Sequence, residues 1–104
     1  MANLDQIVDY LADEFIVETC DYGSQLTIGG NGNAYADWDV SKTGYKPIGI
    51  LGINTDYDGT AQNWCFAWSF YIKDGTNVRL SYKNSGTSQA KVHPVVDVLY
   101  QKTV

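Results

Sequence analysis

The chain has 104 residues, of which 44% are hydrophobic, 13% aromatic and 18% charged, and its formal net charge is −5 at pH 7. This length accommodates one domain with its own core and is too short for two of ordinary size. The net negative charge argues against a nucleic-acid-binding protein, because affinity for a phosphate backbone comes from clustered Lys and Arg. Richness in Tyr and Gly favours strands and turns over helices.

The acidity is confined to the N-terminal segment. Five of the twelve acidic residues lie in residues 1–18, which contain no Lys or Arg, and the other seven are balanced by the seven basic residues of the remaining chain. No apolar window of about 18 residues is present, so we expect no insertion into a membrane. The N-terminus also lacks the basic and apolar regions of a signal peptide, so we expect no export by that route.

Residues 3–17 have the apolar spacing of an amphipathic helix, with Asn3 and Gln6 in the two positions of a capping box. We therefore predict a helix within residues 1–18, followed by a β domain over residues 19–104. A helix of about four turns is marginally stable alone, so its apolar stripe must pack either on its own β domain or on a second subunit. The residues of the stripe are Leu4, Val8, Leu11 and Phe15.

The β domain is predicted from about six short apolar or alternating segments separated by turns rich in Gly, Asn and Asp. Residues 33–40 alternate so that Trp38 points inward while Asp37 and Asp39 point outward. Residues 48–53 are apolar on both faces, which predicts either a central strand or one that contacts another subunit through Ile50 and Ile53. The predicted fold class is mainly β, an antiparallel sandwich or jelly-roll-like domain preceded by one helix.

Residues 63–84 predict a β-hairpin that organises this domain. Asp74 to Asn77 provide residue types that tolerate positive φ, as a tight turn requires. Period-two spacing predicts that the large apolar residues of both limbs share the core face, and that the half-polar opposite face meets water or a second subunit. The core-face residues are Trp64, Phe66, Trp68, Phe70 and Ile72 in the first limb and Val78, Leu80 and Tyr82 in the second.

One loop resembles the first half of a calcium-binding loop. Asn54, Asp56 and Asp58 place oxygen atoms at alternate positions before Gly59. Such a loop then needs a bidentate Glu, and Cys65 occupies that position. We therefore predict a plain strand connection and no metal site.

The sequence shows no catalytic constellation. His93 is the only histidine, and it lies in a strand pattern without a nucleophile motif. Asp37 and Asp39 share a face, but neighbouring carboxylates on a strand are more often solvated than catalytic. Cys20 and Cys65 are too few for a disulfide framework, so we expect packing thiols, with a disulfide as the alternative. We predict no enzymatic activity and no cofactor.

Aromatic residues provide the stronger binding signal. Tyrosines in loops or on the non-core face offer rigid contact area for a sugar or a protein, or else fill a subunit interface. A carbohydrate-binding, lectin-like module is therefore an alternative function. Its candidate ligand-binding residues are Tyr35, Trp38, Tyr45 and Tyr57.

Several stretches resemble small tail-associated proteins of phages and prophages of low-GC Gram-positive bacteria. The N-terminal MANLDQIVDYLAD is similar to their short starting helix. SKTGYKPIGILGIN, the aromatic hairpin and KNSGTSQAKVHPVVDVLY are similar to C-terminal β modules of their tail-fibre or baseplate proteins. Residues 19–40 lie outside the resemblance. No binding residue of the family carries over by motif.

The resemblance implies a non-enzymatic virion protein that has a structural or host-attachment role in a tail fibre, baseplate or capsid appendage. Such a protein would be made in the cytoplasm of the bacterial host and located in the virion. As such β modules are commonly trimers, the implied partners are two further copies of the chain, other virion proteins and a host-surface glycan.

Overall fold

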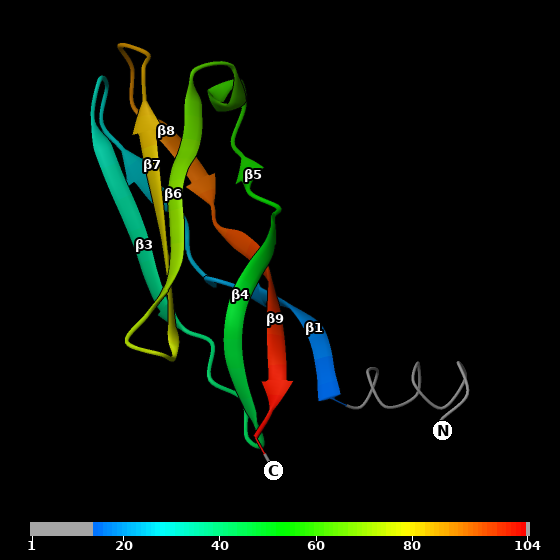
Figure 1. Ribbon diagram of the computed structural model, residues 1–104. Coiled ribbons are helices and arrows are strands. Elements are labelled where there is room, and N and C mark those ends of the chain that lie inside the picture. The colour runs from blue at the N-terminus through cyan, green and yellow to red at the C-terminus, as the bar shows by residue number, and fades with distance from the viewer. Residues whose placement is uncertain (1–13, 104) are drawn as a thin grey trace.

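The computed structural model describes residues 14–103. Residues 15–103 form nine β-strands and one short 3₁₀ turn, so the chain is mainly β, as its composition predicted. Figure 1 shows their arrangement. The elements are β1 (Phe15–Asp21), β2 (Leu26–Ile28), β3 (Asn33–Asp39), β4 (Tyr45–Ile53), β5 (Asp56–Tyr57), η1 (Ala61–Asn63), β6 (Cys65–Lys73), β7 (Asn77–Asn84), β8 (Ala90–His93) and β9 (Val95–Lys102).

The strands form three antiparallel sheets with the orders β1-β9-β4, β2-β8-β5 and β3-β7-β6. The first two are successive parts of one long ribbon, because β8 and β9 are separated only by Pro94 (Figure 1). Proline has no N–H to donate to a ladder, which explains the break at this residue. Tyr22 N donates to Pro94 O (3.0 Å) and Asn54 N donates to Val95 O (2.8 Å), so hydrogen bonding continues across it.

The core lies between this ribbon and the β3-β7-β6 sheet. Strands β7, β8 and β9 contribute fully buried side chains at alternate positions, as period-two spacing requires. The predicted core residues of β7, namely Val78, Leu80 and Tyr82, are confirmed because each is 0% exposed. The Tyr82 hydroxyl lies 2.6 Å from Thr55 Oγ1, and the Tyr100 hydroxyl donates to Val40 O at 2.6 Å, so both buried hydroxyls are hydrogen-bonded.

The predicted hairpin is confirmed as β6 and β7, with Asp74 and Gly75 at φ of 55° and 78° in its turn. The prediction that Trp64, Phe66 and Trp68 belong to the core is wrong, because they are 37%, 49% and 60% exposed. In the first half of β6 the core face is instead formed by the small residues Cys65 and Ala67.

The reason is a β-bulge between Ala67 and Ser69, which inserts Trp68 as an extra residue. Beyond the bulge the alternation of core-facing and outward-facing residues is shifted by one position. Phe70 and Ile72 therefore lie opposite Leu80 and Val78 on the core side. Phe70 is nevertheless half-exposed because β6 is an edge strand. The spacing of apolar residues alone cannot reveal an inserted residue, and it assigned both halves of β6 to one face.

The predicted N-terminal helix falls mainly on residues 1–13, which lie outside the described residues together with Leu4, Val8 and Leu11. Its predicted end is wrong, because Phe15 to Val17 begin β1 in antiparallel register with Gln101 to Leu99. The β domain therefore starts at residue 15 rather than at residue 19. The antiparallel pairing of this segment with β9, together with the strand preference of its β-branched residues, outweighs the helical spacing of its apolar residues.

Strand β4 is an edge strand of its sheet, with β9 in the centre. Two register shifts, between Pro47 and Gly49 and between Ile50 and Gly52, insert Ile48 and Leu51 as extra residues. The inserted side chains are exposed, whereas Ile50 and Ile53 pack against the core of their own chain. The two bulges explain why this run is apolar on both faces.

The fully buried Asn84 joins two loops. Its Nδ2 donates to Ser88 O (2.8 Å) and lies 3.1 and 3.2 Å from the carbonyl oxygens of Ile28 and Gly29. Its Oδ1 accepts from Gly86 N at 2.9 Å, and its backbone N donates to Gly32 O at 2.9 Å. One side chain thus fixes the β2–β3 loop against the β7–β8 loop.

Asn84→Ala is expected to lower the free energy of unfolding by about 2–3 kcal/mol, because it leaves several buried backbone groups without their partner. Urea denaturation measures this change. Asn33→Ala, at an exposed position of β3, is the matched control and should change stability by less than about 0.5 kcal/mol. Equal losses in the two variants would contradict the assigned role of Asn84.

Candidate functional site

The β3-β7-β6 sheet has one side that points away from the core, which we call the outer face. In β3, Trp38 lies opposite Val78 on the core side, whereas Asp37 lies opposite Arg79 on the other side. This confirms the predicted orientation of Trp38 and Asp37. The register aligns the outward residues of the three strands in four rows, Asn33–Lys83–Phe66, Tyr35–Ser81–Ser69, Asp37–Arg79–Tyr71 and Asp39–Asn77–Lys73.

An ion cluster occupies the last two of these rows, which contain Asp37, Arg79 and Lys73. Asp37 Oδ2 accepts hydrogen bonds from Arg79 Nη2 at 2.8 Å and from Lys73 Nζ at 3.4 Å. All three side chains are partly buried. Asp37 Oδ1 and Arg79 Nε are buried without a hydrogen-bond partner among the described residues. The cluster therefore has unused hydrogen-bonding capacity at these two atoms.

Two tyrosines flank this cluster. The guanidinium carbon of Arg79 lies 4.2 Å from the centre of the Tyr35 ring, within cation–π distance. Tyr71 lies opposite Arg79 in the neighbouring strand. Both tyrosines remain about half-exposed, at 54% and 45%. The result is a surface in which two aromatic rings flank a fixed pair of opposite charges.

The hydrogen bond from Arg79 lowers the pKa of Asp37 below its ordinary value of 3.8, partial burial opposes this shift, and Lys73 adds to it. A carboxyl with this environment stays ionised at neutral pH. The same hydrogen bond raises the pKa of Arg79. The arrangement suits binding through charge and hydrogen bonds, and neither group is placed to exchange a proton near pH 7.

The structure places only one of the four predicted ligand-binding residues on the outer face, namely Tyr35. Trp38 points inward and contacts the Tyr22 ring, with 5.4 Å between ring centres. Tyr45 lies at the start of β4 beside Lys42, and Tyr57 lies in β5, both packed partly against the core. The four residues are therefore not brought together on one surface.

The basic residues of the outer face were not among the predicted ligand-binding residues. Arg79 and Lys73 occupy the half-polar face of the hairpin, which was predicted to meet water or a partner. Phe66 was missed because it was assigned to the core. The spacing of Arg79 and Tyr71 across the hairpin turn was the available signal, because it places them opposite each other.

The predicted calcium-loop residues take different positions. Asn54 Nδ2 donates to Asp97 Oδ2 at 2.9 Å, while Asp56 and Asp58 line an open depression of about 410 Å³ together with Gln25, Tyr57 and His93. His93 Nε2 contacts Asp21 Oδ1, which joins β8 to the end of β1. Within residues 14–103, no group of three or more His, Cys, Asp or Glu side chains could together hold a metal ion.

Both cysteines are free thiols, as expected for packing residues. Cys65 is buried in the core, and burial raises the pKa of its thiol. Cys20 is half-buried, with its sulfur 3.3 Å from the Tyr100 hydroxyl. The disulfide alternative is therefore not realised in this structure.

Comparison with models of known families, with curated proteins and with solved structures found no match to this chain. Its function is therefore proposed from its own residues. Among the described residues, no helix has both the length and the apolar character needed to cross a membrane.

The lowered pKa of Asp37 predicts that the free energy of unfolding decreases at acid pH. Its ion pair contributes stability above the unfolded-state pKa, and that contribution is lost as pH falls through the lower folded-state pKa. The difference in unfolding free energy between the wild type and Asp37→Asn should therefore be greatest near neutral pH and shrink below about pH 4. Urea denaturation across this pH range measures the difference.

The control for this prediction is an Arg79→Met background, in which the effect of Asp37→Asn should lose most of its dependence on pH. A difference that stays constant from neutral to acid pH in the wild-type background would contradict the assigned coupling between Asp37 and Arg79.

Proposed function

We propose that this chain is a non-enzymatic attachment module of a phage virion, in a tail fibre, baseplate or capsid appendage, and that it binds its target through the outer face. The observation that carries this proposal is the pair of half-exposed rings, Tyr35 and Tyr71, beside the Asp37–Arg79 ion pair, with the half-exposed ring of Phe66 two rows away on the same face. Aromatic and Arg side chains dominate binding energy at protein surfaces because they combine large contact area with directed hydrogen bonds.

The rigidity of the supporting sheet favours this use. The opposite side of β7 is packed in the core, and β7 lies between β3 and β6. Side chains held on such a sheet lose little conformational entropy on binding. The packing of the β3-β7-β6 sheet on the long ribbon also supports a β-sandwich of jelly-roll type, which forms part of the proposal.

If the outer face is the attachment surface, removal of either of its two exposed tyrosine rings should weaken binding to the host cell. Tyr35→Ala and Tyr71→Ala should each weaken binding of the labelled protein to susceptible low-GC Gram-positive cells by about 10-fold, because each removes an exposed ring. Flow cytometry over a panel of such bacteria measures the binding. Val17→Ala removes a similarly exposed apolar side chain from β1 and should bind as the wild type. Undiminished binding by both tyrosine variants would exclude the outer face as the attachment surface.

The module is further proposed to act as an oligomer, a trimer in the virion, in contact with other virion proteins. Each of the three strand bulges in the described part of the chain exposes a large apolar side chain, Ile48 and Leu51 on β4 and Trp68 on β6. Strands β4 and β6 are both edge strands. Bulged edges disfavour pairing of strands between molecules, so these side chains support packing between copies instead.

Light scattering at about 50 µM should therefore show an oligomer, and Leu51→Ser should shift it towards monomer because it removes apolar contact area. Val17→Ser provides a similarly exposed apolar control and should leave the mass unchanged. A wild-type monomer at this concentration would exclude the assembly part of the proposal and leave the attachment part standing.

Carbohydrate binding is the second candidate function. It is favoured by the planar guanidinium of Arg79 and the carboxylate of Asp37 beside the Tyr35 ring, since sugars present hydroxyl groups next to an apolar ring face. A glycan array tests this function on the wild type and on Tyr35→Ala. Retained binding in the variant would count against the outer face as the sugar site.

A further inference from the structure

The β1-β9-β4 sheet has one side that points away from the core, which we call the ribbon face. Along β9 the buried residues Val96, Val98 and Tyr100 point into the core, so the half-buried residues that alternate with them belong to the ribbon face. The register aligns the residues of this face in three rows, Phe15–Gln101–Lys46, Val17–Leu99–Gly49 and Thr19–Asp97–Gly52. The ribbon face therefore includes Phe15, the last residue of the predicted apolar stripe.

The middle row of the ribbon face is apolar and accessible. Val17 is 53% exposed, and Leu99 beside it is half-buried. On the other side of Leu99 lies Gly49, where a Cβ atom would have open space around it. A glycine inside a strand often marks a place that another backbone approaches closely. The row thus offers an apolar strip with room beside it for a further element of structure.

The position and length of the N-terminal segment fit this strip. Because β1 begins in the first row, residues 1–13, which lie outside the described residues, join the ribbon face at Glu14. Their apolar residues at helical spacing, Leu4, Val8 and Leu11, would span about 10 Å in a helix that rises about 1.5 Å per residue. The three rows span about 13 Å along β1, at about 3.3 Å per residue. The stripe and the face therefore match in length.

The charges of the segment and the face are complementary. Residues 1–13 contain three aspartates and no Lys or Arg. Lys46, in the first row, is exposed and forms no ion pair within residues 14–103. Asp97, in the third row, already accepts hydrogen bonds from Thr19 and Asn54. The charge that remains to be paired on these rows is therefore positive, which favours an acidic partner.

We propose that residues 3–11 pack as an amphipathic helix on the ribbon face of their own chain, with Leu4, Val8 and Leu11 against Val17 and Leu99. A helix this short is marginal alone, and burial of its apolar stripe supplies the missing stabilisation. A segment joined directly to its docking surface has an effective concentration in the millimolar range. The contact within one chain is therefore favoured over the same contact between two copies.

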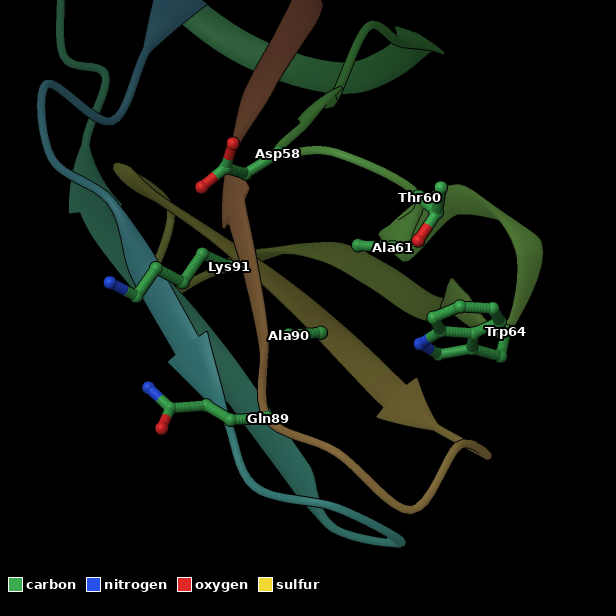
Figure 2. Close-up of a pocket in the computed structure, with 7 residues that line it drawn as sticks. All are labelled: Asp58, Thr60, Ala61, Trp64, Gln89, Ala90 and Lys91. Carbon is green, nitrogen blue, oxygen red and sulfur yellow. The ribbon is translucent and has the colours of Figure 1, made fainter.

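Other accessible apolar side chains are less suitable for this segment. Trp64 lies beside a depression at the end of the molecule that carries η1, away from the start of β1 (Figure 1). The side chains of Asp58, Gln89 and Lys91, which line the same depression, extend away from Trp64, so they form no apolar strip with it (Figure 2). The outer face of the β3-β7-β6 sheet lies on the other side of the core from the ribbon face.

This inference goes beyond the proposed function and does not rest on it. Attachment through Tyr35 and Tyr71, and packing between copies through Leu51, depend on other residues. Failure of either would leave the docking of the N-terminal segment untouched, and the reverse also holds.

The first test is NMR spectroscopy of the full chain with labelled Leu and Val methyl groups. Nuclear Overhauser effects should connect the methyl groups of Leu4, Val8 and Leu11 with those of Val17 and Leu99. A filtered experiment on a mixture of labelled and unlabelled chains separates contacts within one chain from contacts between chains. Absence of these effects, or their occurrence only between chains, would overturn the proposal.

Hydrogen exchange provides the second test. Amide protons of residues 4–11 should exchange at least about 10-fold more slowly in the full chain than in a synthetic peptide of residues 1–14, because the isolated helix is marginal. Val17→Asp should remove this protection, since it places a carboxylate in the apolar row opposite an acidic segment. Lys46→Glu should reduce the protection about 3-fold through lost attraction.

Phe66→Asp is the matched control, because it makes the same change as Val17→Asp at a similarly exposed apolar position outside the ribbon face. It should leave the exchange of residues 4–11 unchanged. If Val17→Asp does not fold, Lys46→Glu keeps the test decisive because it alters only an exposed charge. Exchange in the wild type as fast as in the peptide would refute the docking, as would full protection in Lys46→Glu together with Val17→Asp or, if that variant does not fold, in Lys46→Glu alone.

Discussion

The hydrogen bonds of the buried Asn84 side chain are the interaction on which the β2–β3 and β7–β8 loops depend. A buried amide must find hydrogen-bond partners, and Asn84 finds them in both adjoining loops, at Ser88 O and Ile28 O and at Gly86 N. The residues that follow it, Ser85 and Gly86, then bind and support Trp64. The position of the Trp64 ring therefore depends on a core residue that Trp64 itself does not hydrogen-bond.

The second organising feature is the set of three β-bulges found within residues 14–103. Each bulge adds one residue to an edge strand and turns a large apolar side chain outward, at Ile48, Leu51 and Trp68. The bulges also disturb the edges of β4 and β6, which makes uncontrolled strand pairing between molecules less favourable. Association through side chains then becomes the available mode of contact, in agreement with the proposed assembly role.

The outer face combines aromatic rings with fixed charges. Its Asp37–Arg79 pair lies between two half-exposed tyrosines, Tyr35 and Tyr71. Such a surface offers contact area and directed hydrogen bonds together, which suits a macromolecular partner.

The sequence by itself determined the β class, the hairpin turn at Asp74 and Gly75, the buried face of β7 and the outward direction of Asp37, because these depend on local turn chemistry and strict alternation. Only the tertiary structure decided that Phe15 begins a strand, since pairing with β9 is a long-range contact. It also decided that Phe66 faces solvent and that Trp64 rests on Gly86. A bulge is an inserted residue with no distinctive composition, and the partners of a buried amide lie far apart in the chain, so neither could be predicted from local patterns.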